Sequence, residues 1–195
     1  VSPRGDSGVF NGRIQRLRKD LEKSNLDGII IGGSSNLFYL SNLRSSAGFL
    51  LVRVESDVIY LVIDFRYKTA INDLLEAGFM PSNLEVVIVA GSYEETLANI
   101  VKDSSVQRLG VEADHMSVRL WHWLSERVGG DLVPVNELVE GHRLLKDSCE
   151  ISILRRAGEL LTCAFQDALD VVREGSTERE VAQAIDQIIG AKGFE

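Results

Sequence analysis

The stretch Arg143–Glu195 decides the fold assignment of this chain, and it reads RLLKDSCEISILRRAGELLTCAFQDALDVVREGSTEREVAQAIDQIIGAKGFE. It predicts two helices. Asp147 can cap the first, and Glu150 at the third helical position can close a capping box. Thr177 and Glu180 have the same relation in the second. Apolar residues recur at helical spacing in both, at Ile153, Ala157, Leu160, Ala164, Ala168, Val171, Val181, Ile185 and Ile188.

The first of these helices is predicted to be continuous over residues 148–173, which is about 39 Å at 1.5 Å per residue. Gly175 follows it, and a residue without a Cβ can adopt the left-handed turn that ends a helix. Cys163 falls on the apolar face, so we expect its thiol to be buried and unreactive.

The preceding part of the chain, residues 11–138, alternates between strand and helix patterns. This alternation predicts an α/β fold with a mixed, mostly parallel sheet flanked by helices. Strands are expected near residues 28–32, 49–54, 58–63, 86–89, 107–112 and 132–135. Residues 1–10 are polar and rich in helix breakers, so we interpret them as a disordered or appended tail. The change to purely helical patterns places the domain boundary at residues 138/139.

Several short motifs carry a family resemblance. Arg143-x-x-Lys146-Asp147-x-x-Glu150-Ile151 resembles the start of the catalytic domain of the pita-bread metallopeptidases, which include aminopeptidase P, prolidase, methionine aminopeptidase and creatinase. The chain is also similar to these proteins, in order and spacing, at Ser35–Ser41, Asp64-x-Arg66-Tyr67, Gly110-Val111-Glu112 and Gly175-x-Thr177-Glu178-x-Glu180. It departs from them at Asn42, where a glycine is common, and at Arg44, where a small polar residue is common.

The resemblance implies a creatinase-like N-terminal domain over residues 11–138. Residues 139–195 would be a linker and the first two helices of an incomplete pita-bread α+β domain. The whole protein would be a metallo-aminopeptidase or dipeptidase, a proline-specific hydrolase that releases the residue preceding proline. Two divalent metal ions, manganese or else cobalt or zinc, would be bound by two aspartates, one histidine and two glutamates, all beyond Glu195. No catalytic or metal-binding residue is therefore expected in this chain, which would be inactive alone.

The same resemblance implies that the N-terminal domain shapes access for a proline-containing peptide and helps to build a homodimer. Tyr39 and Arg44 are the residues expected to contact substrate. For Tyr39 a second interpretation stays open, a core aromatic residue whose hydroxyl is hydrogen-bonded. The apolar faces of the last two helices would normally lie against a sheet that this chain lacks, and their exposure favours a dimer or larger species.

Composition restricts the function classes. The chain has 195 residues, 45% of them hydrophobic and 26% charged, and a formal net charge of −8. An acidic chain without a basic stripe argues against a nucleic-acid partner, and no apolar run is long enough to span a bilayer. Cys149 and Cys163 match no metal-binding spacing, so we expect reduced thiols and a cytoplasmic protein.

The individual residues contain no active site of their own. His115, His122 and His142 match no metal-binding motif, and His122 between Trp121 and Trp123 is interpreted as part of a core or interface cluster. The Gly32–Gly33 turn could hold a phosphate at a helix N-terminus, but the rest of a nucleotide-binding motif is absent. Two alternative functions remain open: a non-catalytic peptide- or histone-binding module of the same fold, and creatinase-like amidine hydrolysis.

Overall fold

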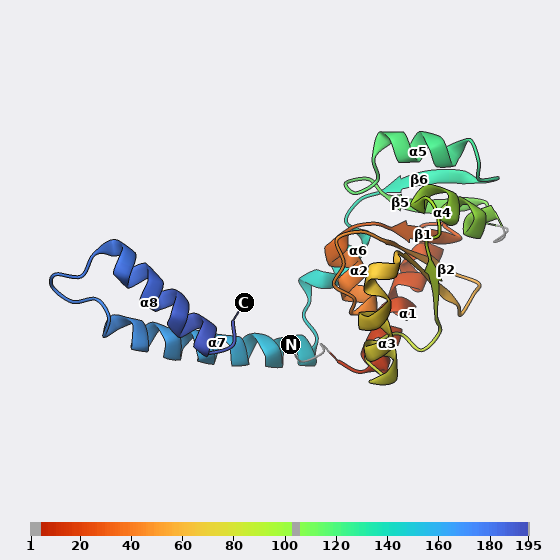
Figure 1. The fold of residues 1–195 in the computed structure, drawn as a ribbon. Coiled ribbons are helices and arrows are strands. Elements are labelled where there is room, and N and C mark those ends of the chain that lie inside the picture. The colour runs from red at the N-terminus through yellow and green to blue at the C-terminus, as the bar shows by residue number, and fades with distance from the viewer. Residues whose placement is uncertain (1–4, 103–105, 195) are drawn as a thin grey trace. The chain divides into compact units, whose positions relative to one another are not determined.

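A computed structural model of the chain describes residues 5–102 and 106–194. The chain divides into two compact units, residues 1–145 and residues 146–195, which are described separately here (Figure 1). No described helix is both long enough and apolar enough to cross a membrane.

The first unit is built on a six-stranded sheet of order β4-β3-β2-β1-β5-β6. Its strands are β1 (Gly28–Ile31), β2 (Phe49–Arg53), β3 (Ile59–Ile63), β4 (Leu84–Ile88), β5 (Arg108–Glu112) and β6 (Asp131–Val135). β2 pairs antiparallel with both of its neighbours, and the other three pairings are parallel. The sheet is therefore mixed and mostly parallel, as the sequence predicts.

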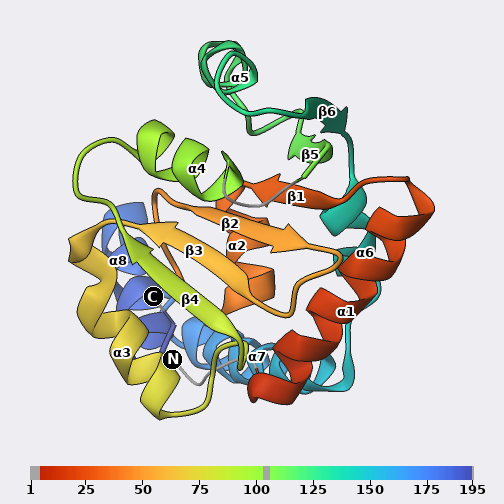
Figure 2. The same cartoon turned by 90° about the vertical axis from the view of Figure 1, so that its right-hand side faces the viewer.

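Helices cover both faces of this sheet (Figure 2). They are α1 (Ser7–Lys23), α2 (Ser34–Ser41), α3 (Lys68–Glu76), α4 (Tyr93–Lys102), α5 (Val118–Ser125) and α6 (Leu138–Leu144), with a 3-10 turn, η1, at Phe65–Tyr67. Alternate residues of β1 face opposite sides. Ile29 and Ile31 join the core under α1, α2, α3 and α6, whereas Ile30 joins the core under α4 and α5. Two buried cores thus flank one sheet.

The N-terminal boundary differs from the prediction. α1 begins at Ser7, because Asp6 accepts hydrogen bonds from the backbone N–H groups of Gly8 and Val9. Phe10 is fully buried. Residues 7–10 therefore belong to the fold rather than to a tail, and the prediction for residues 1–4 lies outside the described residues.

Helices α2 and α6 mark two further differences. α2 was not predicted, since the Ser35–Ser41 segment was identified by resemblance and not by periodicity. α6 lies in the first compact unit, which extends to Leu145. It belongs there because it contacts α1 and α2, so the units divide after residue 145 rather than 138.

The second unit is a helical hairpin of α7 (Ser148–Leu169) and α8 (Glu178–Ala191). Both predicted capping boxes are present, at Asp147 with Glu150 and at Thr177 with Glu180. α7 runs without a break but ends at Leu169 instead of residue 173, and Gly175 adopts the left-handed conformation in the following turn.

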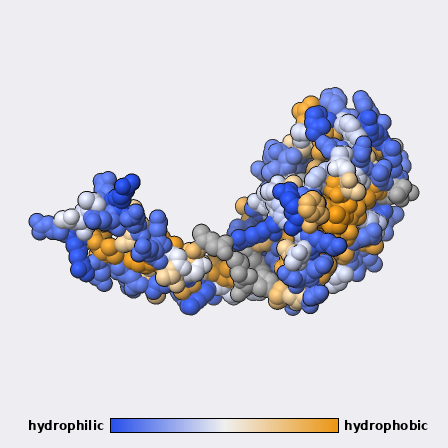
Figure 3. Space-filling model, in the orientation of Figure 1, coloured by the Kyte–Doolittle hydropathy of each residue, from blue (hydrophilic) through white to orange (hydrophobic). Residues whose placement is uncertain are grey.

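The apolar faces of the hairpin are largely open (Figure 3). Ala164 is the buried residue of α7, and α8 has none among its described residues. An open apolar groove of about 210 Å³ lies between the helices, lined by Leu161, Ala164, Phe165, Ala168, Leu169, Val172, Ile185 and Ile189. The prediction of a buried Cys163 is wrong, because its thiol is exposed while the next residue, Ala164, makes the close packing contact.

Candidate functional site

The candidate site lies at the carboxyl edge of the sheet in the first unit. Ligands of open α/β sheets bind at this edge, where the strand order reverses. Here the order reverses between β1 and β5, since the chain moves from β1 toward β4 on one side and then returns to β5 on the other. Gly32 and Gly33 follow β1 at this point, and Glu112 ends β5.

A carboxylate of the chain itself occupies this switch point. The backbone N–H groups of Gly32 and Gly33 donate to Oε2 of Glu112 at 2.8 and 2.7 Å. Gly33 packs closely against His115, because a Cβ there would lie 2.4 Å from the ring of this exposed side chain and the ring would have to move. The turn that could have held a phosphate at the start of α2 is thus filled by Glu112, which is only 6% exposed.

Asn36 of α2 continues this polar network. Its side-chain amide donates to Oε1 of Glu112 at 2.6 Å and also to Oε1 of Glu140 on α6. Its carbonyl oxygen accepts a hydrogen bond from Nη1 of Arg143 at 2.8 Å. Asn36 is fully buried. The hydrogen bonds of its side-chain amide connect α2 to β5 and to α6.

Tyr39 lies in the interior of the first unit. It is 5% exposed, the guanidinium of Arg13 lies 4.0 Å from its ring centroid, and Arg13 donates to its backbone carbonyl at 2.7 Å. Its hydroxyl donates to the carbonyl oxygen of His142 at 3.5 Å, a long contact. The side chain thus occupies the position expected of a core aromatic residue, and its substrate contact stays a prediction.

Arg44 lies on the loop that joins α2 to β2. Its side chain is exposed and its guanidinium lies 5.4 Å from the ring centroid of Phe38. Among residues 5–102 and 106–194 it has no hydrogen-bond or ion-pair partner. A cation of this kind is available to bind an acceptor group, so its role in substrate contact also stays a prediction.

The conformation of this loop is defined at both ends. Asn42 has a φ of 64°, which asparagine and glycine tolerate best, and this explains why an asparagine can replace the family's common glycine. The side-chain amide of Asn42 donates to the carbonyl oxygen of Phe79 at 3.0 Å. Further along, the backbone N–H of Ser46 donates to the hydroxyl of Tyr67 at 3.0 Å. The loop is therefore fixed to η1, which precedes α3, and to the segment that follows α3.

Asp64 lies at the same sheet edge and caps η1, because its carboxylate accepts a hydrogen bond from the backbone N–H of Arg66. Arg66 donates to both carboxylate oxygens of Asp64, at 2.9 and 2.7 Å, and these bonds hold the pKa of Asp64 well below its usual range. Tyr93 donates to Asp64 at 2.8 Å. Burial, and then this hydrogen bond, raise the pKa of Tyr93 to about 12. Arg66 is thus the ion-pair partner of Asp64.

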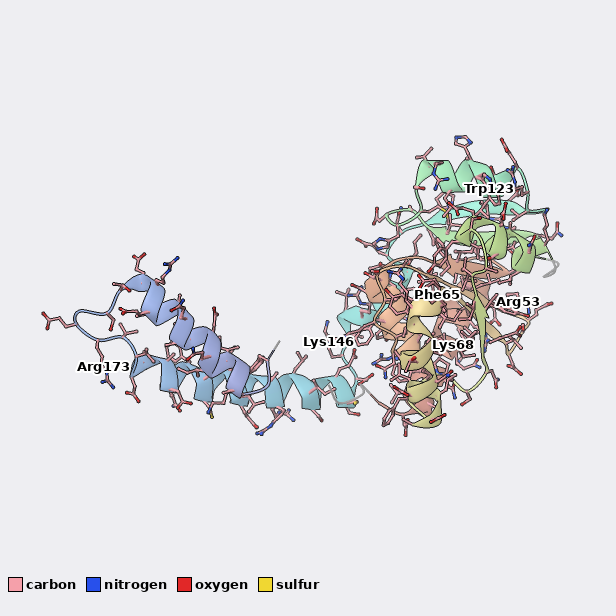
Figure 4. All side chains as sticks on the ribbon, viewed as in Figure 1. Arg53, Phe65, Lys68, Trp123, Lys146 and Arg173 are labelled. Carbon is pink, nitrogen blue, oxygen red and sulfur yellow. The ribbon has the colours of Figure 1, made fainter. Side chains whose placement is uncertain are left out.

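His142 and His122 lie on different helices, α6 and α5, and have different partners. His142 contacts Asp20 through Nε2 at 2.6 Å. On α5, which carries Trp123 (Figure 4), the ring of His122 lies edge-on to Trp121. The guanidinium of Arg127 lies 4.1 Å from the ring centroid of Trp123. No three histidine, cysteine, aspartate or glutamate side chains within the described ranges converge in a way that could bind a metal ion. The metal ligands that the resemblance implies would lie beyond Glu195, so this observation leaves that expectation untested.

Comparison with known families agrees with this architecture. A model of the Creatinase/Prolidase N-terminal domain matches residues 13–145. The chain belongs to this family. That match begins within α1 and ends with α6, so it covers the described sheet, both of its helical layers and the whole polar network around Asn36.

The similarity to individual proteins extends into the second unit. The uncharacterized peptidase YqhT of Bacillus subtilis (strain 168) is 29% identical over 184 residues, which cover 94% of this chain and 50% of that protein. The structure of an Xaa-Pro dipeptidase from Bacillus anthracis matches with a TM-score of 0.81 at 27% identity, over 93% of this chain and 49% of that one. The chain spans about half the length of these relatives.

One further solved structure corresponds to the first unit alone. The N-terminal domain of the cytoplasmic peptidase PepQ from Mycobacterium tuberculosis H37Rv matches with a TM-score of 0.58 at 28% identity. The match covers 67% of this chain and 97% of that one. A family member's N-terminal domain therefore forms an independent structure, which accords with the division after residue 145.

Sequence reasoning did not identify the Glu112 network. The signal was present in two of the motifs, because Glu112 ends the Gly-Val-Glu segment and Asn36 lies in the Ser35–Ser41 segment. Nothing in the spacing of residues 36 and 112 indicates that they touch. Their contact depends on β1 and β5 being parallel neighbours, and that pairing is a property of the fold.

Proposed function

We propose that this chain is the N-terminal portion of a dinuclear-metal Xaa-Pro aminopeptidase or dipeptidase that cleaves before proline. The observation that carries the proposal is the match of 93–94% of this chain to about half of a peptidase and half of an Xaa-Pro dipeptidase. The metal-binding residues would lie in the remaining half, beyond Glu195, with manganese, cobalt or zinc as the metal. This chain would shape substrate access.

The substrate would be a peptide with proline as its second residue. Arg44 is proposed as the contact that this chain makes with the substrate, because its side chain is exposed and its guanidinium has no hydrogen-bond or ion-pair partner among the described residues. Tyr39 is buried, so it would affect substrate binding indirectly, by holding the backbone of α2 in place. The protein is further proposed to be a cytoplasmic homodimer, and the open apolar groove on α7 and α8 supports association through these helices.

The proposal is tested by comparing this chain with the protein expressed to its natural stop codon. The 195-residue chain should neither hydrolyse an Xaa-Pro peptide nor take up Mn²⁺ in a calorimetric titration, because two-metal hydrolysis needs several carboxylates converging on ions about 3.5–4 Å apart. The longer protein should bind the metal and cleave before proline, and a chelator should abolish cleavage.

Two outcomes contradict this proposal. Stoichiometric Mn²⁺ uptake by the 195-residue chain would mean that the metal site lies within it. A longer protein that takes up no metal and cleaves no peptide would support the non-catalytic binding module instead. Sedimentation of the longer protein tests the dimer separately, since a monomer at micromolar concentration would contradict the proposed association only.

A further inference from the structure

The segment between β1 and β2 is held at one end by an internal anion. Oε2 of Glu112 accepts both N–H groups at the start of α2, and Oε1 accepts the amide of Asn36 one turn later. Backbone N–H groups at a helix N-terminus carry a partial positive charge and form a natural anion site. In this domain the anion is the carboxylate of Glu112 on β5, so these N–H groups connect two parts of the fold.

The opposite end of the same segment carries Arg44. α2 has 8 residues and leads through the left-handed Asn42 directly into the loop. The loop is hydrogen-bonded to Tyr67 at Ser46, by the backbone N–H at 3.0 Å and by the hydroxyl at 2.9 Å. α2 is therefore a short rigid element whose start is set by Glu112 and whose end sets the direction of Arg44.

We propose that Glu112 is a positioning residue for substrate binding, which acts through α2 on the Arg44 loop. This inference rests on the proposed function, in which Arg44 contacts the peptide. Hydrogen bonds to an ionised carboxylate are roughly twice as strong as neutral ones. Loss of the carboxylate leaves three donors unpaired in the interior, and α2 then has to shift or fray to satisfy them.

The test is kinetic and uses the protein expressed to its natural stop codon. In the Glu112→Ala variant, KM for an Xaa-Pro peptide should rise about tenfold while kcat changes less than about twofold, since binding is lost without loss of the reacting groups. Added acetate should lower KM again, because its methyl carbon and carboxylate can replace the Cγ atom and the carboxylate that the alanine lacks. Sodium chloride at equal ionic strength should not.

Two further variants make the result specific. Glu112→Gln keeps the side-chain shape but places an NH₂ group against one of the three donors, so a smaller KM increase without acetate rescue is expected. It also replaces the alanine variant if that protein does not fold. Glu94→Gln is the matched control, because Glu94 is likewise a paired carboxylate, with Arg119 at 2.8 Å, but it lies on α4 under the other face of the sheet. Its KM should not change.

A double-mutant cycle tests whether Glu112 acts through Arg44. If it does, Arg44→Gln should raise KM in the natural background and have little further effect in the Glu112→Gln background, because residues that act as a unit are not additive. Independent, multiplicative effects on KM would overturn the inference. An unchanged KM in both Glu112 variants would do the same.

Hydrogen exchange distinguishes failure of this inference from failure of the proposed function. In the 195-residue chain, Glu112→Gln should speed exchange of the α2 amides and of the loop through Ser46, with α4 and α5 unaffected. If the longer natural protein cleaves no Xaa-Pro peptide, the proposed function falls, and the exchange data alone decide whether Glu112 holds the segment. Unchanged exchange over residues 34–46 would overturn the inference whatever the activity.

Discussion

The two units of this chain bury their apolar residues to very different extents. In the first unit, residues 1–145, every residue of β1 is buried and helices cover both faces of the sheet. In the second unit, Leu161, Phe165 and Leu169 are each more than half exposed. Both units contain well-capped amphipathic helices. Capping and periodicity therefore determine where helices form, but they do not determine whether a core closes.

The two units should differ most in whether each folds when it is expressed without the other. Residues 1–145 alone should unfold cooperatively, because both cores and the Asn36 network lie within them. Residues 146–195 alone should lose most of their helix, since helices of this length are marginal in water without tertiary packing. Circular dichroism of the two fragments provides the measurement. A stable hairpin from residues 146–195 would show that the pair of helices needs no further partner.

A matched pair of truncations should show the same contrast within the 195-residue chain. Ile30→Ala removes a side chain with no exposed surface and should lower the free energy of unfolding by about 2–5 kcal/mol, from lost transfer energy and the cavity left behind. Phe165→Ala removes a larger side chain that is 64% exposed, and it should cost less than about 0.5 kcal/mol.

Urea unfolding followed by tryptophan fluorescence and by circular dichroism measures both variants. The two tryptophans of the chain, Trp121 and Trp123, both lie in the first unit, so fluorescence reports on that unit alone while circular dichroism includes α7 and α8. Equal losses for Ile30→Ala and Phe165→Ala would mean that the apolar face of the hairpin is covered in solution, for example by a second copy.

Local sequence signals predicted much of the first unit. The β-branched run of β1 and the alternation of elements gave the fold class, and all six strands form within about two residues of their expected positions. Helix ends were less accurate at α1, because the Asp6 cap lies in a segment whose glycines and serines resemble a tail. α2 was missed because its N-cap is Gly33, which has no side chain to cap the helix. Glu112, 79 residues away in the sequence, accepts a hydrogen bond from the backbone N–H of Gly33 instead.

The candidate site was predictable only in part, for the same physical reason. Arg44 stands out in the sequence because it replaces a small residue; its side chain is exposed, and its contact with substrate stays a prediction. The burial of Tyr39 agrees with one of the two interpretations that the sequence left open. The packing of Arg13 of α1 against its ring was not predicted. Contacts between elements distant in the sequence are set by sheet order, which no local pattern encodes.

The smallest expected difference is in the response to pH. Hydrogen bonds from Arg66, and secondarily from Tyr93, lower the folded-state pKa of Asp64, so its stabilisation is complete above its unfolded pKa of about 3.9 and is lost as the pH falls further. The pKa of Glu180 on α8 is also lowered, chiefly by the hydrogen bond from the backbone N–H of Thr177. Its stabilisation is therefore lost in the same direction, as the pH falls. Both units therefore weaken in acid, through Asp64 in one and Glu180 in the other.

Alkaline weakening through a tyrosine is expected in the first unit. Since the pKa of Tyr93 rises to about 12, its stabilisation is complete below its unfolded value of about 10 and is lost between these values. Tyr93→Phe should therefore flatten the fall in Tm, followed by tryptophan fluorescence, over this range. Tyr67→Phe is the control, because hydrogen bonds from Ser46 lower the pKa of Tyr67 and give the opposite sign. If both variants flatten the curve equally, general charge repulsion rather than the bond between Tyr93 and Asp64 causes the alkaline loss.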